Sequence, residues 1–179
     1  MIQRIKDRLH SEDKGFTLIE LMVVVLIIAI LIAIAIPTFL GARTRAQDRA
    51  AQSSLRNTVT AAKALFTDNE DYAAATVAAL TSGEPSLSFV AAGVASTKST
   101  EVSSANVVTA PSTKAEEFYG AVMSSSGTCW FVRDAVDPAS NPGTGWAKDT
   151  DNSGACTGTR ASGIADATWV KEPGNSPEV

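Results

Sequence analysis

Residues 14–37 read KGFTLIELMVVVLIIAILIAIAIP, the most apolar stretch of the 179-residue chain. Between Phe16 and Ile36 there are 21 residues and a single charged side chain, Glu20. As an α-helix this run would be about 31 Å long, close to the hydrocarbon thickness of a bilayer. We therefore expect a membrane-spanning helix in this part of the chain.

The residues before this run are polar, with four basic and three acidic side chains in residues 1–15. Three interpretations fit a charged leader followed by an apolar run. A secretory signal peptide would be cut beyond the run, near Ala33 and Ala35, but its apolar region has only about 7–15 residues. A plain signal anchor fits the length and leaves Glu20 unexplained. The third interpretation accounts for both the leader and Glu20.

The segment KGFTLIEL, residues 14–21, resembles the cleavage and assembly motif of type IV prepilins. It combines a charged leader, a Gly-Phe pair, an acid four residues beyond the Phe and an apolar run. The resemblance continues through Pro37 and the Ala-rich segment that follows, to about residue 70. Beyond that point only the layout is similar.

The resemblance implies how the chain would be processed. The prepilin peptidase, a membrane aspartyl peptidase, would cut after Gly15, remove residues 1–15 and methylate the new amine of Phe16. Glu20 would direct assembly into a filament. The partners would be other copies of the chain, the peptidase, an inner-membrane assembly platform and, before assembly, the membrane itself.

Electrostatics supports a special role for Glu20. A charged side chain inside a membrane helix costs a few kcal/mol, so it usually has a partner or a function. Glu20 lies about one helical turn from Phe16, so the amine created by the cut would lie in the same apolar layer. The amine of one subunit could then neutralise Glu20 of the next. The alternative is that Glu20 lies near the membrane surface and reaches water.

Pro37 ends the apolar run, and Gly41 follows it. Proline removes one helical hydrogen bond and crowds the preceding turn, so we expect a kink or local melting between about residues 36 and 41. The alternative is a simple helix boundary.

The chain from residue 38 to about residue 67 has the pattern of an amphipathic helix. Leu55, Val59, Ala62 and Phe66 recur at spacings of four, three and four, which predicts one buried stripe. We expect this stripe to pack against a sheet.

We divide the chain into a cleaved leader (1–15), a transmembrane and assembly helix (16–37), an amphipathic helix (38–70) and a β-rich globular head (71–179). The predicted fold class is α+β. The resemblance implies the type IV pilin fold, in which a long N-terminal helix packs on a small antiparallel sheet with a disulfide-tied C-terminal loop.

The clearest strands in the head are residues 118–123 and 128–132, which residues 124–127 join into a hairpin. Residues 81–113 are rich in Ser, Thr, Ala and Gly. They are expected to form a surface connection with short strand pieces, residues 87–90 and 107–108, or a low-complexity linker.

Two later segments complete the expected head. Residues 137–163 hold many Asp, Asn, Gly and Pro residues and are expected to be loops. Residues 167–170 are expected to form a last strand.

Cys129 and Cys156 are the two cysteines of the chain. An even number in a chain with a membrane or export signal predicts one disulfide, the alternative being two buried thiols.

Residues 149–154, DTDNSG, resemble the first half of a calcium loop, with Asp149 and Asp151 as oxygen ligands. Arg160 stands where an EF-hand has its bidentate Glu, so an Asx-rich turn is the alternative. Apart from this weak calcium candidate, no cofactor or metal is expected.

Composition argues against an enzyme. The single histidine, His10, lies in the leader, so the processed chain would lack the base of a Ser-His-Asp triad and any imidazole ligand for zinc. Asp134 and Asp137 are close in sequence, but the sequence indicates no base to act with them. No small-molecule substrate is expected, and the net charge of −4 with scattered basic residues argues against nucleic acid.

The leading hypothesis is therefore a structural subunit of a type IV pilus, serving motility, adhesion or DNA uptake. The alternatives are a pseudopilin of a type II secretion system and a minor tip pilin that acts as an adhesin or DNA receptor. The chain would first be a single-pass protein of the cytoplasmic membrane. It would then join an extracellular pilus, or a periplasmic filament if it is a pseudopilin.

Overall fold

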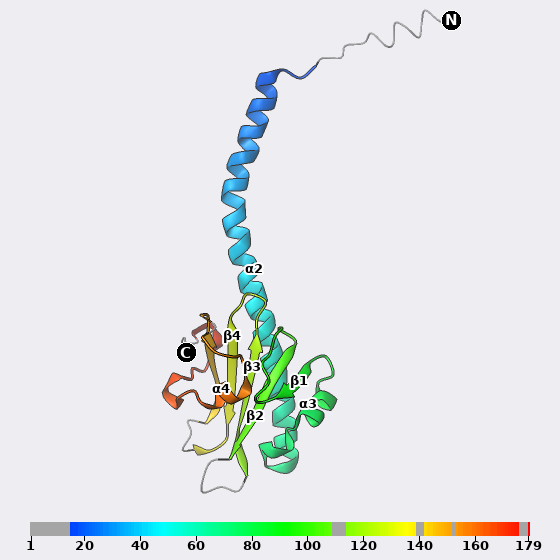
Figure 1. Cartoon of the computed structure of the whole chain (residues 1–179), viewed down its shortest axis with the longest axis vertical. Helices are drawn as coiled ribbons and strands as arrows, with labels where there is room; N and C mark the ends of the chain where they lie inside the picture. The colour runs from blue at the N-terminus through cyan, green and yellow to red at the C-terminus, as the bar shows by residue number, and fades with distance from the viewer. Residues whose placement is uncertain (1–14, 109–113, 139–141, 152, 176–178) are drawn as a thin grey trace, which may run out of the picture. The chain divides into compact units, whose positions relative to one another are not determined.

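The computed structural model describes residues 15–108, 114–138, 142–151, 153–175 and 179. Their internal contacts divide the chain into two units, of which the first ends at Ala42 and the second runs from Arg43 to Val179. In the first unit the described residues are Gly15, Phe16 and Thr17 followed by the start of helix α2. The second contains the rest of α2 and every other element (Figure 1). The amphipathic part of α2 therefore belongs to the head.

The chain forms an α+β fold, as predicted. Helix α2 runs from Leu18 to Asn69. The strands are β1 (Ser88–Ala91), β2 (Glu101–Val108), β3 (Ala115–Met123), β4 (Cys129–Ala135) and β5 (Gly143–Asp149). The short helices are η1 (Tyr72–Ala74), α3 (Val77–Gly83), α4 (Gly158–Ser162), η3 (Asp166–Thr168) and η4 (Pro173–Asn175).

The predicted stripe on α2 is confirmed. Leu55, Val59 and Ala62 are buried, and Phe66 packs against the same hydrophobic cluster. The helix ends where the backbone of Glu70 turns left-handed, with φ of 51°. The Glu70 N–H still donates to the Phe66 carbonyl at 2.6 Å, which is a common way to end a helix.

The sheet has the order β1-β2-β3-β4-β5. It is mostly antiparallel, as predicted, with one parallel pair between β1 and β2. The predicted hairpin of β3 and β4 is confirmed, and in its turn the Ser124 N–H donates to the Thr128 carbonyl at 2.9 Å. Gly127 has φ of 93° in this turn, a conformation that favours glycine.

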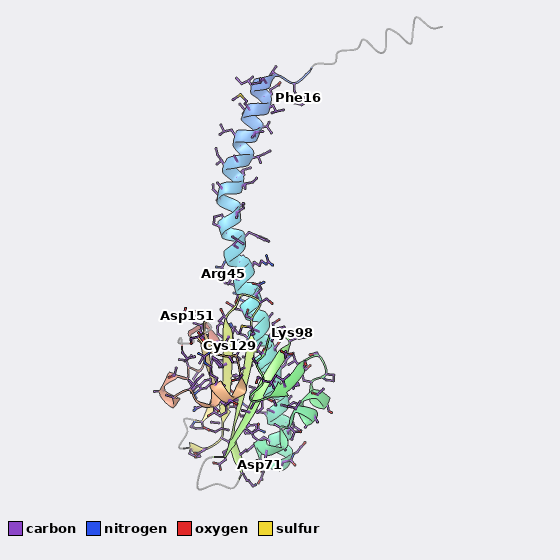
Figure 2. The ribbon with its side chains drawn as sticks, in the orientation of Figure 1. Phe16, Arg45, Asp71, Lys98, Cys129 and Asp151 are labelled. Carbon is purple, nitrogen blue, oxygen red and sulfur yellow. A yellow bond between two sulfur atoms is a disulfide. The ribbon has the colours of Figure 1, made fainter. Side chains whose placement is uncertain are left out.

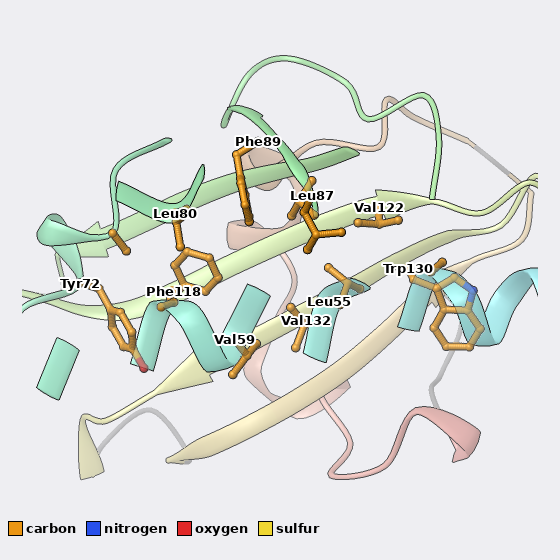
Figure 3. Packing of buried hydrophobic residues seen from close by; sticks show 14 of the residues in the cluster. Leu55, Val59, Tyr72, Leu80, Leu87, Phe89, Phe118, Val122, Trp130 and Val132 are labelled. Carbon is orange, nitrogen blue, oxygen red and sulfur yellow. The ribbon is translucent and has the colours of Figure 1, made fainter. Parts of the chain in front are cut away.

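Both faces of the sheet are covered. On one face, Leu55 and Val59 of α2 lie in one cluster with Val122 of β3 (Figure 3). On the other face, Phe131 of β4 lies in a second cluster with Trp169 of the C-terminal segment. Because successive side chains of a strand point to opposite faces, β4 is buried at all of its positions.

Three predictions for the head need correction. The strand pieces predicted at residues 87–90 and 107–108 are confirmed as β1 and the end of β2. Strand β2 already begins at residue 101 and lies between β1 and β3, so residues 101–106 are neither a surface connection nor a low-complexity linker. Residues 143–149 were predicted to be loop and form β5. In place of a last strand at residues 167–170, the structure has the 3-10 helix η3, and Val170 makes an isolated bridge to Trp146.

Candidate functional site

The predicted cleavage site lies directly before α2. Gly15 and Phe16 are outside the helix, which begins at Leu18, and both are exposed. The Phe16 side chain is 88% exposed (Figure 2). An exposed, non-helical peptide bond is the kind that a peptidase can bind. The rest of the predicted leader, residues 1–14, lies outside the described residues.

Thr17 and Glu20 bind each other at the start of α2. The Thr17 N–H and hydroxyl donate to one Glu20 carboxylate oxygen at 2.9 and 2.8 Å. In return, the Glu20 N–H donates to the Thr17 hydroxyl at 3.3 Å. This reciprocal pattern is a capping box, which satisfies backbone donors that a helix N-terminus leaves open. The Glu20 carboxylate therefore has polar partners within its own chain.

The apolar run forms a helix whose side chains are exposed all round. Every large apolar side chain from Leu18 to Leu40 is about half exposed or more. Among the described residues, α2 is long and apolar enough to cross a membrane, judged by length and composition. Glu20 is the one charged side chain between Phe16 and Leu40. Such a surface needs an apolar environment, either lipid or other copies of the helix.

Pro37 lies inside α2, so the alternative of a helix boundary is wrong. The Thr38 hydroxyl donates to the carbonyls of Ile34 and Ala35, at 3.2 and 2.9 Å. A Thr hydroxyl bound in this way often accompanies bending of a helix. The kink or local melting between about residues 36 and 41 stays a prediction, and in the structure Pro37 and Gly41 are both helical.

The predicted disulfide is present. Cys129 and Cys156 are bonded, with a Cα–Cα distance of 5.6 Å, and both are buried. Cys129 begins β4, and Cys156 lies just before α4. The bond therefore joins the C-terminal segment to the start of β4, an inner strand of the sheet, as in the predicted disulfide-tied loop; Figure 2 labels Cys129.

Asp149, the first predicted calcium ligand, is engaged by protein groups. Its carboxylate pairs with Arg160 and accepts from the backbone N–H groups of Asp151 and Ser153, at 3.0 and 3.1 Å. The first of these bonds is that of an Asx turn. Among the described residues, no group of three or more acidic, His or Cys side chains could hold a metal ion. Calcium binding stays a prediction.

A buried polar cluster around Asp134 was not predicted. The Asp134 carboxylate accepts from the Tyr72 hydroxyl, from the Thr144 hydroxyl at 2.7 Å and from the Lys63 ammonium at 2.9 Å. Burial and the Asp134 carboxylate raise the pKa of Tyr72, so its hydroxyl keeps the proton that it donates to Asp134. The donors come from α2, η1 and β5, up to 71 residues away in sequence, so no local pattern could have revealed them. The cluster ties these elements to β4.

Two comparisons with known proteins found a match. Residues 11–36, which include Gly15, Phe16 and Glu20, match the family described as prokaryotic N-terminal methylation motif. The type IV major pilin protein PilA of Myxococcus xanthus (strain DK1622) is 44% identical over 65 residues. This match covers 36% of the chain and 30% of the length of that curated relative. No solved structure matches the chain.

Proposed function

We propose that this chain, a type IV pilin-like protein by its N-terminal methylation motif and its α+β fold, is a structural subunit of a pilus filament. The single observation that carries the proposal is the position of Glu20. It is the one charged side chain of an exposed apolar helix, and it lies one turn from the residue that cleavage would make the N-terminus.

The processing steps follow from the motif. The prepilin peptidase removes residues 1–15, and the new amine of Phe16 is methylated. Before cleavage, the leader with its seven charged side chains holds the chain in the cytoplasmic membrane. After cleavage, an inner-membrane assembly platform moves the apolar helix from the bilayer into an extracellular filament of many copies.

In the filament, the Phe16 amine of one copy pairs with Glu20 of a neighbour. A charge in an apolar layer is costly, and pairing it with an opposite charge removes much of that cost. A subunit in the wrong register would leave both charges unpaired, so the pair selects the correct register. This role depends on packing and one ion pair and needs no catalytic group or cofactor.

The test separates the charge of Glu20 from its capping role. Glu20→Gln keeps the side-chain acceptor of a capping box and removes the charge, whereas Glu20→Ala removes both. We expect both variants to lose surface fibres, measured as protein sheared from cells, while Glu172→Gln, an exposed acid of the head, assembles normally. N-terminal sequencing and mass analysis of the fibres should find a chain that begins at N-methylated Phe16.

Three results would contradict the proposal. Normal fibres from Glu20→Ala would show that the acid is dispensable. If Glu20→Gln gave normal fibres and Glu20→Ala gave none, the role of Glu20 would be to cap the helix, and its charge would not be required. Fibres that retain residues 1–15 would exclude processing at Gly15. Separately, filaments confined to the periplasm would favour the pseudopilin alternative.

A further inference from the structure

Three arginines follow the apolar run on α2, and we call Arg43, Arg45 and Arg49 the arginine collar. All three are exposed, and Figure 2 shows Arg45 on the helix. None of them makes an ion pair or side-chain hydrogen bond with another residue of the described part of the chain. The neighbouring acid, Asp48, accepts a hydrogen bond from the Ser126 hydroxyl of the β3–β4 turn. The described part of the head therefore supplies no ion pair to the three guanidinium groups.

The collar residues point to different sides of the helix. Each residue of an α-helix is rotated by about 100° from the one before. Arg45 is therefore about 200° from Arg43, while Arg49 is only about 40° from Arg45. A docking face of one other protein would reach one side of this helix. A partner that surrounds the helix can bind all three side chains at once.

The collar also lies at a suitable distance from the apolar run. Large apolar side chains continue beyond Pro37 with Phe39 and Leu40, so the stretch from Phe16 to Leu40 is about 36 Å long as a helix. In a helix tilted as membrane spans usually are, Leu40 lies at the edge of the hydrocarbon layer and is its last large apolar residue. Along an α-helix, Arg43 and Arg45 follow it by about 4.5 and 7.5 Å, and Arg49 by about 13.5 Å. The headgroup layer of a bilayer is about 5–8 Å thick on each side. Arg43 and Arg45 fall within that layer, and the long side chain of Arg49 can reach back to it.

We propose that the arginine collar binds the phosphates of anionic phospholipids around the membrane-anchored chain. Guanidinium groups bind phosphate oxygens through two parallel hydrogen bonds, and basic residues next to a span attract anionic lipid. The bound lipids hold the base of the head at the membrane surface, and they must be released when the subunit leaves the bilayer. The inference rests on one part of the proposed function, namely that the chain is anchored in a membrane before it joins a filament.

The test measures lipid selectivity of the full chain in neutral phosphatidylcholine vesicles. Electron paramagnetic resonance compares the association of spin-labelled phosphatidylglycerol with that of spin-labelled phosphatidylcholine. We expect the wild-type chain to prefer phosphatidylglycerol. The triple variant R43Q/R45Q/R49Q should lower this preference at least about fivefold, the factor that corresponds to about 1 kcal/mol for one basic residue near an anionic surface. The basic residues of the leader are the same in every protein compared.

Two control variants make the result specific. R43K/R45K/R49K keeps the charges and should retain most of the preference. K98Q/K148Q/K171Q removes the same charge from the head and should retain all of it. The proposal would be overturned if K98Q/K148Q/K171Q lost as much of the preference for phosphatidylglycerol as R43Q/R45Q/R49Q. It would also be overturned if R43Q/R45Q/R49Q kept the whole preference.

The test is independent of filament formation. It is made on single chains in a bilayer, so failure of the proposed function would leave its result intact. If R43Q/R45Q/R49Q keeps the lipid preference and its filaments fall apart at lower salt than wild-type filaments, the collar is a contact between copies. That result would also overturn the proposal.

Discussion

The Glu20 carboxylate needs a polar partner at each stage that we propose. In the isolated chain, Thr17 supplies two donors to one of its oxygens. In the filament, the Phe16 amine of a neighbouring copy would supply a positive charge. Thr17 lies after the cleavage site, so its donors remain in the processed chain. A change of partner therefore requires movement of side chains and no refolding of α2.

Asp149 shows how the head keeps a buried acid charged. Burial acts to raise the pKa of Asp149, but the hydrogen bond and charge of Arg160, together with Ser153, outweigh it and hold the pKa below its ordinary value. Arg160→Met would leave a buried carboxylate without its cation. We expect a loss of about 2–3 kcal/mol in the free energy of unfolding at pH 7, less than for a fully buried pair because Arg160 is partly exposed. Urea unfolding of the chain in detergent measures it.

The same variant should change the dependence of stability on pH. Because the pKa of Asp149 is lower in the folded than in the unfolded chain, its contribution is complete above about pH 4 and is lost as the pH falls through the folded-state pKa. The gap between wild type and Arg160→Met should therefore close in acid. Lys171→Met, at an exposed position, serves as the control. A constant gap from pH 7 to pH 3 would contradict this assignment.

The sequence predicts the helices and strands whose apolar residues recur on one buried face. The apolar residues of α2 recur at helical spacing, and this pattern locates its buried stripe. Strand β2 has no such pattern, because two small polar residues, Ser103 and Ser104, are buried next to Val102. Ser103 is fully buried there, and its hydroxyl donates to the Ala91 carbonyl at 3.1 Å. From sequence alone a serine is expected at the surface, because the backbone carbonyl that accepts its hydroxyl in the fold belongs to another strand.

Strand β5 was not predicted, because its sequence also lacks the pattern of a strand with one buried face. Its Gly145 lies against Trp169, and a Cβ there would come within 2.8 Å of the Trp169 Cβ. In the sequence this glycine indicates a loop, whereas in the fold it makes room for an indole ring. The candidate site was easier to predict, because Gly15, Phe16 and Glu20 are neighbours in sequence and need no fold to bring them together.

The contact between α2 and the sheet depends on the absence of a side chain at Gly120. A Cβ at this position of β3 would lie 3.1 Å from Val132 Cγ1 and 3.2 Å from Leu55 Cδ2. We expect Gly120→Ala to lower the free energy of unfolding by about 1–3 kcal/mol, the usual cost of overfilling a packed core. Gly93→Ala is the matched control, since nothing lies within 4 Å of its Cβ.

A double-mutant cycle tests whether the cost of Gly120→Ala comes from its contact with Leu55 of α2. In a Leu55→Ala background the methyl group added by Gly120→Ala gains space, so this substitution should cost less than in the wild type. Urea unfolding of the four proteins gives the coupling. Equal costs in both backgrounds would show that α2 does not restrict this position.

The whole molecule joins two units that bury their apolar side chains in different ways. The first unit exposes apolar side chains on all sides and gains stability only from lipid or other helices. The second unit covers both faces of its own sheet and has its own hydrophobic core. We therefore expect the head to stay folded during the proposed transfer of the apolar helix from membrane to filament.

The disulfide tests this independence. It closes a loop across 27 residues, and in the chain-entropy model such a bond stabilises the fold by about 3.5 kcal/mol. The variant C129S/C156S should therefore unfold at a lower temperature, measured by circular dichroism on the full chain in detergent. The fraction of the variant recovered with membranes should equal that of the wild type, because Phe16–Leu40 is unchanged. Loss of membrane association together with loss of head stability would show that the two units depend on each other.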